Sequence, residues 1–204
     1  MIRALRLDRA GSSAAEFAMV LPLLILFLFG IIDGGRYMWE VNKAEKATQA
    51  GARVAIVTDV LDSGISGQNY VGQTVGGVTL TQGDVVPAAA LGELKCTSAS
   101  CTCQSGSCPG IVAPGDYSTR FDRIVTRMNY MKPDIAASNV SVTYRGSGLG
   151  FAGDPNGMDI APLVTVELTG VQFRPLVLFN AVAFNLPPFR TTLTAEDSDG
   201  SQSN

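Results

Sequence analysis

The chain has 204 residues, enough for one domain or for a modest domain with a membrane anchor. Hydrophobic residues make up 46% of it and charged residues only 16%, a composition that excludes a disordered chain. Histidine is absent, which excludes imidazole general bases, Ser-His-Asp nucleophiles and most catalytic zinc sites. A formal net charge of −3 argues against a nucleic-acid partner, because phosphate binding needs a surplus of Lys and Arg.

The amino-terminal region predicts a membrane-spanning helix. No charged residue occurs from Phe17 to Ile32, and Glu16 is the only one in the 21 residues from Ser12 to Ile32. At about 1.5 Å per residue this stretch makes a helix roughly 31 Å long, which matches the hydrocarbon thickness of a bilayer. Because basic residues precede it, the positive-inside rule predicts a cytoplasmic amino end and an exported remainder. These basic residues are Arg3, Arg6 and Arg9.

A secretory signal peptide has a similar opening, but here no convincing cleavage site follows the apolar core. A processing pattern instead precedes it: a basic leader ends in Gly11, and Glu16 is the fifth residue after that glycine. This arrangement resembles the type IV prepilin signal of the Tad/Flp branch. The resemblance implies that a prepilin peptidase cleaves after Gly11, that Ser12 becomes the new amino terminus, and that a terminal ammonium pairs with Glu16. The alternative is a carboxylate at the headgroup level of an ordinary anchor, where it costs little.

The longer block of residues 11–55 is similar to the TadE-like family of pilus assembly proteins. The motifs that carry this similarity include Phe17 and Pro22 in the apolar run, Asp33, Gly35 and Arg36 at its end, and an Ala-rich motif at 47–53. A weaker similarity covers about 160–197, with an F-x-P-L piece at 173–176 and a final L-T-A. The middle of the chain has no counterpart in the family pattern.

The resemblance implies a minor pilin or pseudopilin that is required for assembly of a Tad (Flp, type IVc) adhesion pilus, with no catalysed reaction and no cofactor. The implied partners are the prepilin peptidase, the inner-membrane assembly platform, the major pilin, sister minor pilins and membrane lipid, and no nucleic acid. The implied location is the bacterial inner membrane, single-pass, with a periplasmic domain that can also reach the extracellular pilus. The alternative is a permanently membrane-anchored periplasmic scaffold or binding domain that never enters a filament.

We divide the chain into a leader (1–11), a transmembrane helix (12–35), an extracytoplasmic continuation of that helix (36–61) and an exported domain (62–204). Apolar and small residues recur at helical spacing as far as Leu61, which predicts one long helix from about Ser13. Its outer half is rich in Ala and Gly, so the chain's own domain, a neighbouring subunit or both pack closely against it. Pro22 removes one backbone donor and can introduce a kink.

The exported domain is predicted to be α+β and pilin-like, with an antiparallel sheet and one packed helix. Helical spacing of apolar residues indicates a helix at 117–131, which Lys132-Pro133 ends. The clearest predicted strands are 140–144, 163–168 and 191–194, with weaker β-branched pieces such as 75–80. The apolar segment 176–189 is too short to span a bilayer, so it is either core or a hydrophobic face, and we expect it to be partly exposed near the membrane.

Four cysteines form a cysteine-rich loop at 96–108 with the spacing C-x4-C-x-C-x4-C: Cys96, Cys101, Cys103 and Cys108. Because an exported domain meets an oxidising compartment, we expect two disulfides rather than a metal site. Three pairings are possible, of which Cys96 with Cys101 and Cys103 with Cys108 would close two small loops.

Two further motifs are interpreted as turns. Residues 148–153 satisfy G-x-G-x-x-G, but a turn follows them where a dinucleotide site requires a helix. Asp154, Asn156 and Asp159 present oxygens that calcium prefers, yet the glutamate that closes an EF-hand loop is missing.

Overall fold

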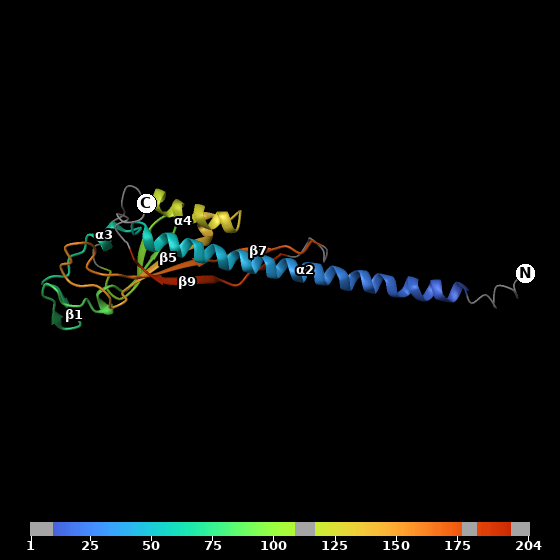
Figure 1. Cartoon of the computed structure of the whole chain (residues 1–204), viewed down its shortest axis with the longest axis horizontal. Coiled ribbons are helices and arrows are strands. Elements are labelled where there is room, and N and C mark those ends of the chain that lie inside the picture. The colour runs from blue at the N-terminus through green and yellow to red at the C-terminus, as the bar shows by residue number, and fades with distance from the viewer. Residues whose placement is uncertain (1–9, 109–116, 177–182, 197–204) are drawn as a thin grey trace, which may run out of the picture. The chain divides into compact units, whose positions relative to one another are not determined.

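The structure is a computed structural model that describes residues 10–108, 117–176 and 183–196 (Figure 1). The chain divides into two compact units, Met1–Glu40 with Gln172–Phe184, and Val41–Val171 with Asn185–Asn204. The helix α2 (Ala10–Val57) contributes to both units and continues through Pro22 without interruption. The predicted long helix is therefore confirmed, and it ends at Val57 rather than Leu61.

The first unit combines the apolar part of α2 with a short two-stranded sheet. Its strands are β7 (Gln172–Phe173) and β8 (Phe184–Asn185), which pair with each other. The apolar segment predicted at 176–189 has a mixed outcome. Leu176 and Phe184 are exposed, Leu186 and Phe189 are buried, and 177–182 lie outside the described residues.

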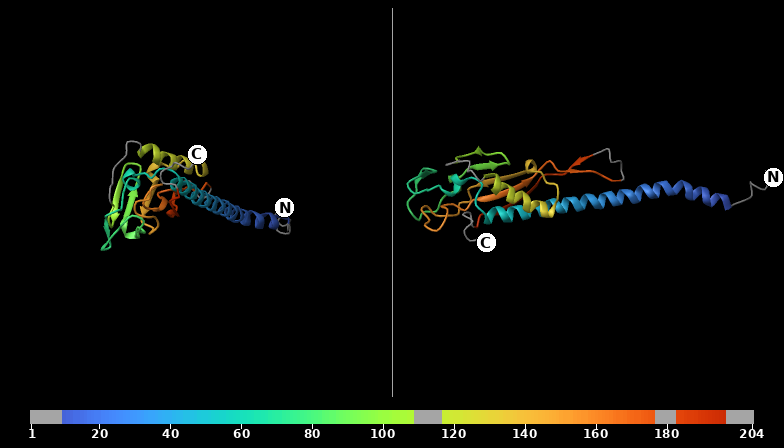
Figure 2. Two further views of the ribbon diagram at one scale, coloured as in Figure 1. Left: turned by 60° about the vertical axis from the view of Figure 1, so that its left-hand side comes forward. Right: turned by 90° about the horizontal axis from the view of Figure 1, so that it is seen from above.

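The second unit holds a five-stranded antiparallel sheet of order β4-β3-β5-β6-β9 (Figure 2). Its strands are β3 (Glu93–Cys96), β4 (Cys101–Ser105), β5 (Val140–Arg145), β6 (Leu163–Leu168) and β9 (Phe189–Thr194). The remaining elements are α3 (Ser63–Ser66), β1 (Thr74–Val75), β2 (Val78–Thr79), η1 (Ala88–Ala90), α4 (Tyr117–Met131) and η2 (Ala137–Asn139). The α+β architecture, the helix at 117–131 and the three clearest strands are confirmed.

One local prediction differs from the structure. The cysteine-rich segment at 96–108, expected as a loop, contains the end of β3 and all of β4, because Leu94 and Cys96 face the core and residues 94–96 pair with β4, with a register shift between Glu93 and Leu94. The β-branched piece at 75–80, expected among strands and loops, lies in the tight β1–β2 hairpin. Gly76 and Gly77 turn this hairpin with positive φ angles, which glycine adopts at little cost.

One face of the large sheet is apolar and packs against two helices. Gly51 of α2 lies against Met128 of α4 and Val166 of β6, so α4 and the last turns of α2 cover the same face (Figures 1 and 2). At the end of α2 the buried Tyr144 hydroxyl accepts the Leu61 N–H at 3.1 Å. The largest fully buried side chains of the second unit include Tyr70, Tyr144, Phe121, Leu61, Leu94, Ile124, Met128 and Leu168.

The opposite face of the sheet is polar and centres on Glu167. Arg190 donates to its Oε1 at 2.7 Å, Lys95 Nζ lies 3.5 Å from its Oε2, and the Ser141 hydroxyl lies 3.4 Å from Oε2. Burial raises the pKa of Glu167, but the hydrogen bonds and charges of Arg190 and Lys95 together outweigh it. The pKa of Glu167 is therefore lowered.

We expect Glu167→Gln to remove part of the acid sensitivity of the domain. A carboxyl with a depressed pKa stabilises the fold above its unfolded value of about 4.3, and this contribution is lost as pH falls through the folded pKa. The free energy of unfolding of the variant, measured in urea over the acidic range, should therefore vary less with pH. Glu93→Gln is the matched control because its pair with Arg145 is more open to solvent. A pH profile unchanged by Glu167→Gln would contradict the role assigned to this pair.

Candidate functional site: the membrane helix and its junction

The apolar part of the predicted membrane segment has no buried residue in the isolated chain. Among the described residues, α2 is the one helix long and apolar enough to cross a membrane, and its most apolar window has a mean hydropathy of 2.5 and is 0% buried. Phe17 and Pro22 of the family-like opening are both exposed on it. An apolar surface of this extent requires lipid or other apolar helices around it.

The predicted processing residues lie at the start of this helix. Gly11 and Ser12 belong to the first turn of α2, and Glu16 follows about one turn later with its side chain exposed. Cleavage after Gly11 and the pairing of Glu16 with an ammonium stay predictions.

The junction at the end of the apolar run is a built site. The carboxylate of Asp33 is only 5% exposed, and its Oδ1 accepts the backbone N–H of Leu176 at 2.9 Å. Arg36, one turn further along α2, donates to the same oxygen at 3.4 Å. A buried carboxylate needs such partners, because desolvation without them is costly. The site thus fastens residue 176 to the helix at the first charged residue after the membrane run.

Aromatic contacts complete this junction. The ring of Phe173, 5% exposed, meets Tyr37 edge to face with centroids 5.4 Å apart, and the guanidinium of Arg36 lies 5.7 Å from the Phe173 centroid. Such pairs contribute about 0.5–1.5 kcal/mol beyond the area they bury. The two family-like motifs, one at 33–36 and one at 173–176, are therefore brought together by the fold, which sequence reasoning did not foresee.

Gly35, unlike Asp33, has no described residue of the junction packed where a side chain would lie. A Cβ at Gly30, Gly34 or Gly35 would have nothing within 4 Å among the described residues. No described part of the chain therefore packs so closely at these positions that it requires glycine. The spacing of Gly30 and Gly34, a G-x-x-x-G in an apolar helix, is a signal for close helix approach that the sequence analysis missed.

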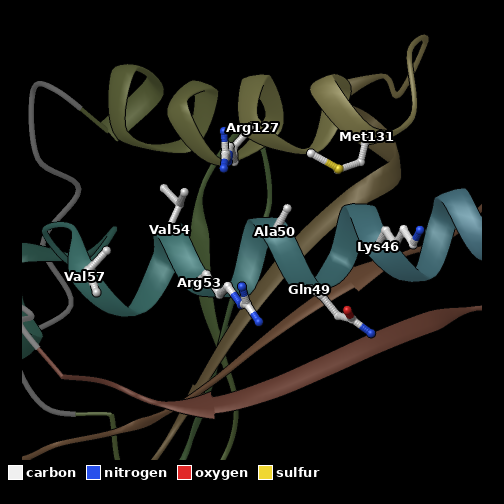
Figure 3. Close-up of a pocket in the computed structure, with 8 residues that line it drawn as sticks. All are labelled: Lys46, Gln49, Ala50, Arg53, Val54, Val57, Arg127 and Met131. Atoms are coloured by element: carbon white, nitrogen blue, oxygen red, sulfur yellow. The ribbon is translucent and has the colours of Figure 1, made fainter.

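A basic groove lies between α2 and α4 in the second unit (Figure 3). Its volume is about 420 Å³, and Ala50 and Val54 point from α2 toward α4, from which Arg127 and Met131 reach back. The lining residues are Lys46, Gln49, Ala50, Arg53, Val54, Val57, Arg127 and Met131. They include three cations and no carboxylate or thiol, so the groove can attract an acidic group but holds no acid–base pair for catalysis.

Both predicted disulfides are present, and they resolve the pairing that the sequence left open. Cys96 is bonded to Cys101 and Cys103 to Cys108. Cys96 and Cys101 are directly opposed in the β3–β4 hairpin, and Cys96 is 0% exposed on the core face of the sheet. Cys103 is exposed on the outer strand. The first disulfide therefore borders the core, and the second closes a surface loop.

Replacing both cysteines of either disulfide by alanine should destabilise the domain by about 2 kcal/mol through loop-closure entropy alone. The two disulfides have the same sequence separation of 5, so this part of the effect is matched. We expect the Cys96/Cys101 variant to lose about 1 kcal/mol more, because it also removes a buried sulfur from the core. Urea unfolding of the two double variants measures the difference, and equal losses would contradict the assignment of Cys96 to the core.

The two motifs interpreted as turns are indeed loop structures. Gly148, Gly150 and Gly153 all have positive φ, and residues 148–153 lie in a loop that no helix follows. Asp159 is buried, and its two oxygens accept the backbone N–H groups of Tyr70 and Asp154 at 2.7 and 3.1 Å. Its carboxylate is thus engaged in holding loops together.

Comparison with known proteins matches part of the chain to a family. A family described as TadE-like protein matches residues 11–53, roughly a fifth of the chain. No curated protein and no solved structure matches the chain. The matched range begins at the predicted cleavage glycine and runs through the apolar part of α2 to the small residues at 47–53.

Proposed function

We propose that this chain, a member of the TadE-like family through its residues 11–53, is a minor pilin or pseudopilin that a prepilin peptidase cleaves after Gly11. The family implies a role in Tad pilus assembly. The observation that carries the finer proposal is the coincidence of the matched range with a continuous helix whose apolar run has no buried residue. Such a run suits a subunit that exchanges lipid for neighbouring helices when it enters a filament.

Glu16 supports this proposal over an ordinary anchor. Its side chain lies on the exposed surface of the apolar helix, directly before Phe17. A carboxylate inside a bilayer costs up to roughly 2.5–3.5 kcal/mol at the centre and less toward the edge. Cleavage after Gly11 creates a terminal ammonium about one helical turn away, which neutralises the carboxylate of the same or a neighbouring subunit.

The proposed role is structural rather than enzymatic. The chain has no histidine, and the basic groove offers cations without a nucleophile or acid–base pair. The proposed partners are the prepilin peptidase, the inner-membrane assembly platform, the major pilin and sister minor pilins. The proposed orientation has the amino end in the cytoplasm and the domain in the periplasm, as the leader arginines predict.

Determination of the mature amino terminus tests this function. We expect protein purified from piliated cells to begin at Ser12, and protein from cells with an inactive prepilin peptidase to retain Met1. Intact mass measurement and amino-terminal sequencing give the answer in both strains. A chain that keeps Met1 in piliated cells would instead support the permanently anchored periplasmic scaffold.

A further inference from the structure

Two apolar side chains in or next to the paired strands β7 and β8 are covered by no described part of the chain. Leu176 is 67% exposed and Phe184 is 52% exposed, while Phe173 and Pro175 on the alternate positions are buried. The sequence carries no charge between Arg174 and Arg190. We infer that this β7–β8 pair is a second membrane contact, in which Leu176 and Phe184 enter the lipid beside the point where α2 leaves the bilayer.

The hydrogen bond to Asp33 fixes the depth of residue 176 relative to the membrane. Asp33 directly follows the uncharged run that ends at Ile32, so it marks the outer limit of the hydrocarbon region. Because the Leu176 amide donates to Asp33 at 2.9 Å, the backbone of residue 176 lies at that same limit. A leucine exposed at this level is adjacent to lipid without any further movement of the chain.

The residues around this level have the composition of a membrane interface. Trp39, the only tryptophan of the chain, is 64% exposed on the same helix, two residues after Tyr37. Arg174 is exposed next to the apolar side chains of the β7–β8 pair. Tryptophan and tyrosine concentrate at bilayer interfaces, and arginine there binds the headgroups of anionic lipids. Lipid acyl chains would therefore cover Leu176 and Phe184, and lipid headgroups would bind Arg174.

This inference depends on the membrane span of α2 and not on pilus assembly. It adds a lipid-binding surface to the junction and gives Asp33 a role as a positioning residue. A test in vesicles contains no peptidase, platform or major pilin, so its failure would leave the proposed pilin function standing. Conversely, a chain that never enters a filament can still make this contact.

Tryptophan fluorescence provides the test. The full chain with Trp39→Phe is reconstituted at a low protein-to-lipid ratio in vesicles of phosphatidylethanolamine and phosphatidylglycerol, and Phe184→Trp or Leu176→Trp supplies the single reporter. We expect lipids with bromine near the headgroup end of the acyl chain to quench both reporters several-fold more than Val78→Trp, an equally exposed position on β2. Phe29→Trp, within the apolar run, is the reference for a reporter in lipid.

Asp33 variants test the positioning role separately. Asp33→Asn keeps an oxygen that accepts the Leu176 amide and should retain bromolipid quenching of the Phe184→Trp reporter. Asp33→Leu removes that oxygen and should lower the quenching toward the Val78→Trp value, while circular dichroism verifies that the domain stays folded. Quenching of both the Phe184→Trp and the Leu176→Trp reporter no greater than that of Val78→Trp would overturn the inference. Protection from aqueous iodide without bromolipid quenching would also overturn it, since protein would then cover these two side chains.

Discussion

Replacement of Glu16 by glutamine is expected to abolish pilus assembly while membrane insertion and export of the domain continue. Glutamine keeps the size and the hydrogen-bonding capacity of the side chain and removes only its charge. An apolar helix accepts a neutral amide at least as well as a carboxylate, so the anchor should insert normally. What is lost is the attraction to the terminal ammonium that the proposed cleavage after Gly11 would create.

The expected effect is large because the proposed minor pilin is required for assembly, so a copy that cannot insert in register stops assembly altogether. A charge pair in a medium of low dielectric constant is far stronger than the same pair in water, and a carboxylate without its cation is unfavourable there. A subunit that lacks the charge has no electrostatic preference for the correct register in the helix bundle. We therefore expect a near-complete loss of surface pili rather than a graded reduction.

Electron microscopy counts of pili measure the outcome, and protease accessibility of the domain verifies export. Glu45→Gln is the matched control, since it makes the same change at an exposed position of the same helix beyond the membrane run. Glu16→Asp keeps the charge on a shorter side chain and should retain part of the assembly. A normal number of pili with Glu16→Gln would contradict the proposed pairing.

Much of the fold was predictable because its signals are local. The spacing of Phe121, Ile124 and Met128 identifies the buried side of α4, and the alternation in β6 identifies a strand with one face in the core. The apolar run from Phe17 likewise needs no knowledge of the rest of the chain. In each case, a short window contains the whole pattern.

The parts that sequence reasoning missed depend on distant residues. The amide of Leu176 reaches Asp33 across 143 positions, and no local pattern encodes that pairing. The strands β3 and β4 were not predicted, for a related reason. The Cys, Thr, Ser and Gln residues of this segment are typical of a loop, and only pairing with β5 places Cys96 on the core face. Register between strands is set by long-range packing, so a single sequence leaves it open.

The small residues on α2 form one of the two contacts that their spacing predicted. The spacing predicted a close contact with the chain's own domain, with a neighbouring subunit, or with both. Ala44, Thr48, Gly51 and Ala55 are all buried within the second unit, and Thr191 of β9 donates to the Thr48 hydroxyl at 3.1 Å. The contact with the chain's own domain is therefore present, and it leaves no free space for a side chain at Gly51.

Replacement of Gly51 by leucine should destabilise the second unit by about 3 kcal/mol, at the upper end of the usual cost of overpacking a core. A Cβ at this position would lie 2.7 Å from Cγ and 2.9 Å from Sδ of Met128, and 3.3 Å from a methyl carbon of Val166. Alanine should cost less than leucine, because it adds a single carbon and favours the helix over glycine by about 1 kcal/mol, but Cγ of the buried Met128 must still shift to admit it. Gln49→Leu, at an exposed position of α2, is the control for the leucine itself.

A double-mutant cycle with Met128→Ala distinguishes overpacking from any other cause of the loss. Met128→Ala alone should cost about 2–5 kcal/mol, because it leaves a cavity in the core. If the new leucine occupies the volume that Met128 vacates, the Gly51→Leu/Met128→Ala variant is more stable than the sum of the single effects predicts. Urea unfolding of the four proteins measures this coupling. Additive losses would mean that the two side chains do not compete for space, and the close contact of α2 with α4 would then be wrong.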